Sequence, residues 1–133
     1  GPYLIEINLI SNLLLEYVSD YSQHPFPEYL RLGIPVALST DDRGMWDSNI
    51  TDEFFVAVKE FNLSWEELLL LSRNSLQYSF VEDDIKQQLL DTYNKRATQF
   101  EKQFRSKGVA GLKASAPVSY GFTCKRYAVC DLR

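Results

Sequence analysis

The sequence predicts an α/β fold with parallel strands, from two short apolar segments and the helix expected between them. Val36–Leu38 is too short and too continuously apolar for a half-exposed strand, which indicates a strand buried on both faces, as in a parallel sheet. Residues 4–10 are rich in β-branched side chains and predict a second buried strand. A strand, a helix and a strand in that order form a βαβ unit, whose strands are parallel.

The segment between these strands predicts two short helices. Ser11 can cap the first helix, which has apolar side chains on one face. A loop follows over residues 19–27, and Pro27 is well suited to be the first residue of the second helix. Gly33 is expected to end that helix before the second strand.

Helices dominate the chain after the second strand. Residues 43–49 predict a loop, and a helix then begins at Thr51 with one apolar face, made of Phe54, Val58 and Phe61. Ser64 and Glu67 form a capping-box pattern, which predicts a helix from Trp65 to about Arg73. We expect Glu66 and Glu67 to be charges of the helix start rather than acid–base catalysts.

The C-terminal half contains one long amphipathic helix. A short helix or turn is expected over residues 74–80. Apolar side chains then recur at helical spacing up to about Gly108, and they indicate a packing face: Ile85, Leu89, Tyr93, Ala97, Phe100 and Phe104. Residues 109–133 show no helical period and predict an irregular tail.

Length and composition predict a single packed unit. The chain has 133 residues, 45% of them hydrophobic, which suffices for one domain but not for two of ordinary size. Gly1 and Pro2 resemble the remnant of a cleaved tag, so we place them outside the fold. The expected division is therefore residues 3–108 as the packed part and 109–133 as the tail.

Charge and cysteine content narrow the set of partners. The formal net charge is −4, and the sequence has no cluster of Lys and Arg. Binding to nucleic acid or to an anionic membrane is therefore not expected. No apolar run approaches the roughly 18 residues of a membrane-spanning helix. Cys124 and Cys130 either form a disulfide, as in a periplasmic or secreted protein, or remain free thiols, as in the cytoplasm. The compartment therefore stays open.

Asp41 and Asp42 are the residues that most suggest chemistry. They follow the second strand directly, at the edge of a parallel sheet where loops carry reactive groups. Adjacent carboxylates raise each other's pKa unless a cation or a hydrogen-bond donor compensates, and a metal ion commonly does so. The alternative is a strand-to-helix turn in which an Asp caps the following helix.

Several motifs occur in order and at suitable spacing: Ile5–Asn12, His24-Pro25, Gly33–Val36, Ser39–Asp42 and Leu68–Phe80. The first four resemble the last two strands of the adenosine deaminase family, and the fifth resembles the helical stretch that follows them. The similarity extends from about Leu4 to Phe104, and it looks closest to the adenosine deaminase-related growth factor type and its bacterial relatives.

The resemblance implies the C-terminal portion of a (β/α)8 TIM barrel of the metal-dependent hydrolase type, helix-rich after its last strand. It implies hydrolysis of the 6-amino group of adenosine or a similar aminopurine nucleoside, with release of ammonia. In that scheme Asp41 ligates one zinc ion and orients the attacking water, while Asp42 hydrogen-bonds the purine. Zinc suits this chemistry because it lowers the pKa of bound water.

This chain departs from the family pattern in ways that affect the site. Leu9 and Arg43 stand where the family often has proline, which bears on the loops that admit substrate. The family's other zinc ligands, a His-x-His pair and a later His, and its general-acid Glu have no counterpart here. His24 is expected to have a structural role or none. A complete barrel needs roughly 250 residues, so we expect an inactive portion whose partner is the missing N-terminal part of the barrel.

Two further hypotheses come from other classes of protein. The chain can be a catalytically inert interaction or regulatory module that acts through its long amphipathic helix, with Tyr93, Phe100 and Phe104 exposed. It can also be a homo-oligomer, in which exposed strand edges pair between two copies.

Overall fold

Two parallel strands form the centre of the structure, a computed structural model that describes residues 3–112 and 121–130. Strand β1 (Ile5–Ile7) pairs with β2 (Val36–Leu38), with Ile5 opposite Val36 and Ile7 opposite Leu38. Over the described residues the sheet has these two strands only. The predicted parallel pair is confirmed, and each strand keeps one edge with no neighbouring strand in the described part.

The crossover between the strands contains α1 (Leu9–Leu14), the short 3-10 helix η1 (Tyr21–Gln23) and α2 (Phe26–Arg31). The prediction of a strand up to Ile10 is wrong, because β1 ends at Ile7 and α1 begins at Leu9. The prediction that Ser11 caps this helix is also wrong, since Ser11 lies inside α1. The cause is a contact distant in sequence: a carboxylate from a later helix accepts the first N–H groups of α1.

The next two helices after β2 are α3 and α4. The predicted loop over residues 43–49 contains a one-turn helix, α3 (Arg43–Trp46), and α4 (Ile50–Phe61) begins one residue before the expected Thr51. Asn49 and Asp52 cap α4 reciprocally. Of the predicted apolar face, Phe54 and Phe61 pack against the core, whereas 41% of the surface of Val58 is exposed. The buried side of α4 is instead formed by Glu53, Val56 and Ala57.

Helix α5 (Trp65–Gln77) has the predicted capping box of Ser64 and Glu67 and packs against β2. It continues past Arg73, so the separate short element predicted over residues 74–80 is for the most part its last turn. Asn74 is buried, and its side-chain amide donates to the carbonyl oxygen of Val36 at 2.8 Å. This hydrogen bond joins α5 directly to the start of β2.

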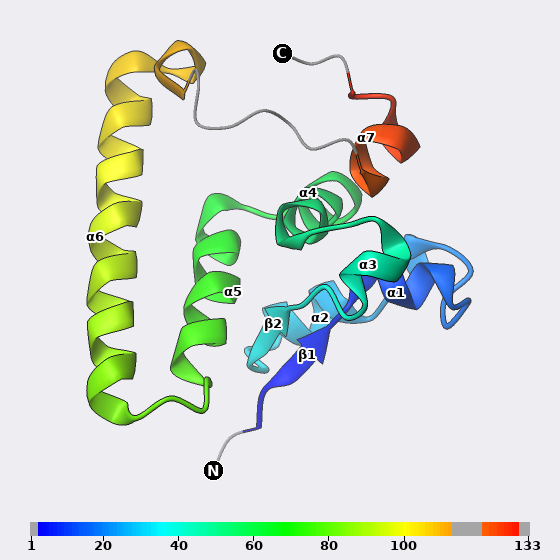
Figure 1. Ribbon diagram of the computed structural model, residues 1–133, viewed down its shortest axis with the longest axis horizontal. Helices are drawn as coiled ribbons and strands as arrows, with labels where there is room; N and C mark the ends of the chain where they lie inside the picture. Colours follow the sequence, from blue (N-terminus) through cyan, green and yellow to red (C-terminus); the bar gives the residue numbers. More distant parts are fainter. Residues whose placement is uncertain (1–2, 113–120, 131–133) are drawn as a thin grey trace.

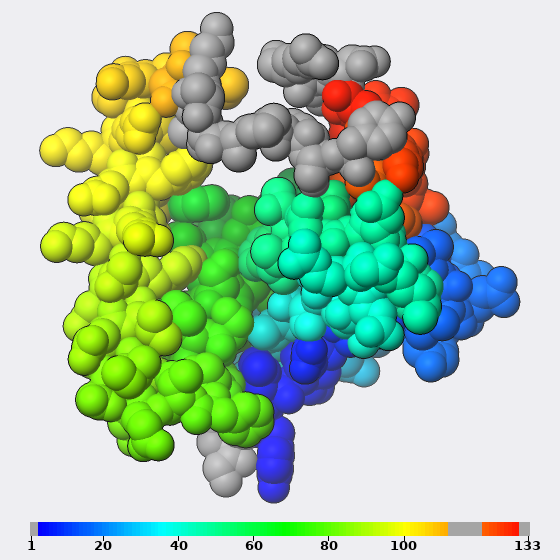
Figure 2. Space-filling view, viewed as in Figure 1, coloured from blue at the N-terminus to red at the C-terminus, as the bar shows by residue number. Residues whose placement is uncertain are grey.

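The long helix α6 (Asp83–Lys107) confirms the predicted amphipathic helix, and Gly108 follows its last residue. It runs beside α5, away from the sheet, and leads into the 3-10 helix η2 (Val109–Leu112) (Figure 1). None of its residues is fully buried in this structure, which describes all of them. Figure 2 accordingly shows α6 as an outer layer of the molecule.

The predicted irregular tail contains a helix. Residues 121–130 include α7 (Phe122–Tyr127), which lies against α4 (Figure 1). Cys124 and Cys130 form a disulfide, which decides between the two alternatives for these cysteines in this structure. The remainder of the predicted tail, at 113–120 and 131–133, is outside the described residues.

One hydrophobic core lies between the sheet and the helices. Its fully buried side chains come from the crossover, from β2, from α4 and from α5: Leu9, Ile10, Phe26, Val36, Val56 and Leu71. Among the helices that the structure describes, none is both long and apolar enough to cross a membrane.

Candidate active site

Asp41 and Asp42 lie at the carboxyl end of β2, where the chain leaves the sheet, and both are exposed. Asp41 has a φ of +50°, the left-handed conformation that Asp tolerates better than most residues. Asp42 is the residue before α3, but its side chain makes no capping hydrogen bond to that helix. The alternative interpretation of this pair as a helix cap therefore lacks the contact that defines a cap.

Ser11, in the helix that follows β1, contacts Asp41 at this site. Its hydroxyl donates to Oδ2 of Asp41 at 2.8 Å, and only 1% of the Ser11 surface is exposed. Because β1 and β2 are parallel, the segments that follow them emerge at the same edge of the sheet. One oxygen of Asp41 is thus held by a buried donor from the neighbouring βα segment.

Glu53 is a buried acid behind this edge, and the sequence analysis did not identify it. It is 0% exposed, and it accepts from the backbone N–H of Leu9 at 2.9 Å (Oε2) and of Ile10 at 3.3 Å (Oε1). Burial raises the pKa of Glu53 to about 8, although the two N–H donors lower it. The sequence did contain a signal for its burial. Glu53 lies three residues before Val56 and four before Ala57, and this spacing places it on the same, apolar face of α4.

His24 supports the crossover rather than the site. Its Nδ1 accepts from the backbone N–H of Phe26 at 3.1 Å, which leaves Nε2 as the donor to Oδ1 of Asn12 at 2.9 Å. Burial lowers the pKa of the imidazole and so favours this neutral form. The structural role expected for His24 is consistent with these contacts.

The donor set of the described residues does not complete a metal site. No group of three or more His, Cys, Asp or Glu side chains converges anywhere in ranges 3–112 and 121–130. A zinc ion is held by four ligands in a typical protein site. Asp41 is a suitable carboxylate ligand because it is accessible and oriented by Ser11, but further ligands must come from outside these residues.

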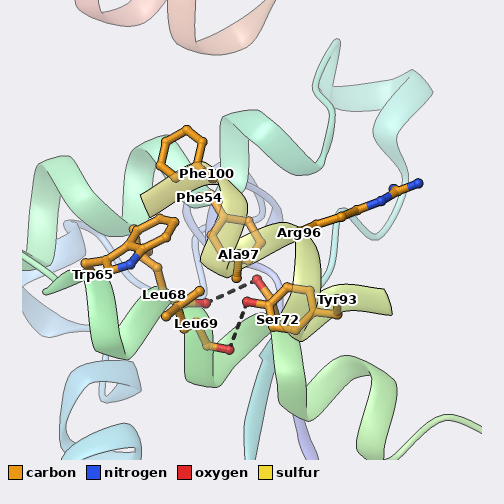
Figure 3. A pocket seen from close by; sticks show the side chains of 9 residues that line it. All are labelled: Phe54, Trp65, Leu68, Leu69, Ser72, Tyr93, Arg96, Ala97 and Phe100. Carbon is orange, nitrogen blue, oxygen red and sulfur yellow. Dashed lines mark hydrogen bonds between the residues drawn. The ribbon is translucent and has the colours of Figure 1, made fainter. Parts of the chain in front are cut away.

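A cavity of about 300 Å³ lies between α5 and α6 and is mostly apolar (Figure 3). Trp65 packs on Phe100 with ring centroids 5.3 Å apart, and the Tyr93 hydroxyl donates to the carbonyl oxygen of Leu69 at 3.2 Å. Two of the three aromatic side chains expected to be exposed for a partner, Tyr93 and Phe100, therefore contact α5, whereas Phe104 stacks on Phe100 within α6. Of their surfaces, 39% of Phe100 and 43% of Phe104 remain exposed. The cavity lacks a group of acids and bases such as catalysis needs, so the candidate active site remains at Asp41.

Comparisons with known proteins identify the family to which this chain belongs. The family model described as adenosine deaminase matches residues 3–96. The chain is 35% identical to an N6-methyl-AMP deaminase of Danio rerio, over 67% of this chain and 26% of the relative. It is 37% identical to an adenosine deaminase of Plasmodium gallinaceum, over 68% of this chain and 25% of the relative.

A solved structure gives the same result. The apo N6-methyl-AMP deaminase from Arabidopsis thaliana matches with a TM-score of 0.68 and 30% identity, over 72% of this chain and 28% of that one. The chain thus spans about a quarter of the length of the relatives that it matches. Together, the matched family model, the relatives and the shared fold show that this chain belongs to the adenosine deaminase family.

Proposed function

We propose that this chain is the C-terminal portion of a zinc-dependent aminopurine deaminase, and that it supplies the double-aspartate end of the last barrel strand. The observation that carries the proposal is the position of Asp41, at the carboxyl end of β2 with its Oδ2 held by Ser11. Active sites of (β/α)8 barrels lie at this end of the strands. The family match supports the reaction class, hydrolysis of a purine amino group with release of ammonia.

The two aspartates have separate tasks in this proposal. Asp41 contributes one carboxylate ligand to zinc, and the hydrogen bond from Ser11 fixes the direction in which that carboxylate points. Asp42 is exposed beside it and accepts a hydrogen bond from a protonated or polarised nitrogen of the purine ring. Bound zinc supplies the chemistry that activates water for attack on the carbon carrying the amino group.

The remaining parts of the site come from the missing N-terminal part of the barrel. Among the described residues each strand has one unpaired edge, where the sixth strand of such a barrel would pair with β1 and the first strand with β2. This chain alone is therefore inactive in the proposal. The substrate is an aminopurine nucleoside or its nucleotide, since the relatives are named for adenosine and for N6-methyl-AMP.

The test uses the full-length protein that carries this chain, with adenosine and N6-methyl-AMP as substrates and ultraviolet absorbance as the readout. Asp41→Asn should lose zinc and lower kcat/KM by about two orders of magnitude or more. Asp42→Asn should retain zinc and bind purine more weakly. Asp91→Asn, an exposed carboxylate of α6, is the control and should change neither. Full zinc content and activity in Asp41→Asn would refute the proposal.

A further inference from the structure

We propose that Glu53 is a positioning residue, which orients Asp41 through the first turn of α1 and the hydroxyl of Ser11. Glu53 belongs to α4, twelve positions after Asp41 in the sequence, and has no direct hydrogen bond to that aspartate among the described residues. The positioning is a property of this chain. Its catalytic consequence rests on the function proposed above.

The first link is between Glu53 and the start of α1. The first N–H groups of a helix have no partner within the helix and need hydrogen-bond acceptors from elsewhere. Asn8 precedes α1 but its side chain makes no capping hydrogen bond to it. Glu53 takes this role from α4, since its two carboxyl oxygens accept from Leu9 and Ile10.

The second link is between α1 and Asp41. Ser11 follows Ile10 directly and is 1% exposed, so its position depends on the turn that Glu53 holds. Its hydroxyl donates to Oδ2 of Asp41, which itself lies in an exposed segment with a left-handed backbone. A shift in the first turn of α1 would move this donor away from the carboxylate.

The burial of Glu53 argues against a role in capping alone. A short polar side chain at the position of Asn8 can cap a helix without placing an acid in the core. Burying a carboxyl is costly, and here it is accompanied by contacts to two successive amides, which define the orientation of α1 more closely than one contact does. In this proposal the geometry of Ser11 and Asp41 depends on the acid.

The test is nuclear magnetic resonance of this chain, with Glu53→Gln and with Glu67→Gln as the matched control. Glu67 also accepts a backbone N–H, that of Ser64 at 2.8 Å, but it lies at the start of α5. Three-bond couplings about the Cα–Cβ bonds of Ser11 and Asp41 should indicate single rotamers in wild type and in Glu67→Gln. In Glu53→Gln they should indicate averaging, because one of the two amides then faces an NH2 group. Unchanged couplings in a folded Glu53→Gln overturn the proposal.

A measurement on the wild-type chain covers the case in which Glu53→Gln does not fold. The coupling through the hydrogen bond from the Leu9 amide nitrogen to the Glu53 carboxyl carbon should be detectable. If this coupling is absent in the wild-type chain, Glu53 does not hold the start of α1 and the proposal is wrong.

The full-length protein separates this proposal from the proposed function. There Glu53→Gln should weaken zinc binding about 10- to 100-fold, as measured with a competing chelator, and should lower kcat more than it raises KM. If the wild-type protein neither binds zinc nor deaminates purines, the proposed function fails. The couplings of Ser11 and Asp41 would still show whether Glu53 orients them. If zinc binding is unchanged in a folded Glu53→Gln, the catalytic consequence is wrong.

Discussion

At the scale of single residues, Asp41 and Glu53 show what a sequence pattern can and cannot reveal. Asp41 was predictable because a short apolar strand ends there and two acids follow it. Glu53 was not singled out because its role depends on α1, a helix more than forty residues earlier in the sequence. The same contact is made at Leu9 and Ile10, which were predicted as strand but form the start of α1.

The pKa of Glu53, raised by burial to about 8, predicts a pH-dependent stability. The carboxyl ionises near 4.5 when unfolded but only near 8 when folded, so its favourable contribution is complete below pH 4.5 and is lost as the pH rises through 8. The free energy of unfolding of this metal-free chain, minus that of Glu53→Gln, should therefore fall between pH 5 and 8, by at most about 1.4 kcal/mol per pH unit. Urea titrations at several pH values measure this difference. A difference that is constant with pH would contradict the prediction.

At the scale of elements, the long periodic segments were predictable and the short ones only in part. The capping box at Ser64 and the amphipathic pattern of α6 are local signals, and both were confirmed. The two short helices expected between the strands correspond to α1 and α2. Helices α3 and α7 were missed because neither shows a helical period in the sequence. Contacts distant in sequence support α7 in particular, since Lys125 pairs with Asp47 at 2.6 Å and Tyr127 donates to Glu60.

The attachment of α5 to β2 depends on one buried amide. Asn74 donates to the Val36 carbonyl at 2.8 Å, so Asn74→Ala removes the partner of a buried backbone group. We expect a loss of about 1–3 kcal/mol in the free energy of unfolding. Asn94→Ala on α6 is the control, because Asn94 is exposed and its side-chain oxygen accepts from Arg73 at the surface; the substitution should cost under about 0.5 kcal/mol. Equal losses in the two variants, measured by urea unfolding, would contradict this assignment.

The residue before α7 lies close to the segment after α3, which predicts that two Gly→Ala substitutions differ in their effect on stability. A Cβ at Gly121 would lie 2.7 Å from the carbonyl oxygen of Asp47, whereas a Cβ at Gly44 would have nothing within 4 Å. Gly121→Ala should therefore destabilise the chain by about 1–3 kcal/mol. Gly44→Ala, within helix α3, should be neutral or slightly stabilising. Thermal unfolding of both variants compares them, and a stable Gly121→Ala would show that α7 does not pack here as described.

At the scale of the whole molecule, the proposed function makes this chain one part of a larger barrel. The parallel order of its two strands was predictable from their apolar runs and the crossover between them. The family's barrel requires six more strands, which no local pattern in this sequence can supply. The matched family model ends at residue 96, so the end of α6 and all of α7 lie beyond it, and family motifs carry no information about α7.

The central claim is that Asp41 completes a zinc site whose other ligands lie in the missing part of the barrel. The most direct measurement is zinc content together with adenosine deamination, for this chain alone and after mixing it with a polypeptide that carries the other six βα units. We predict that the chain alone is inert and free of zinc, that the mixture binds zinc and deaminates, and that Asp41→Asn abolishes both. Zinc binding with turnover by the chain alone, or an Asp41→Asn mixture as active as wild type, would contradict the account.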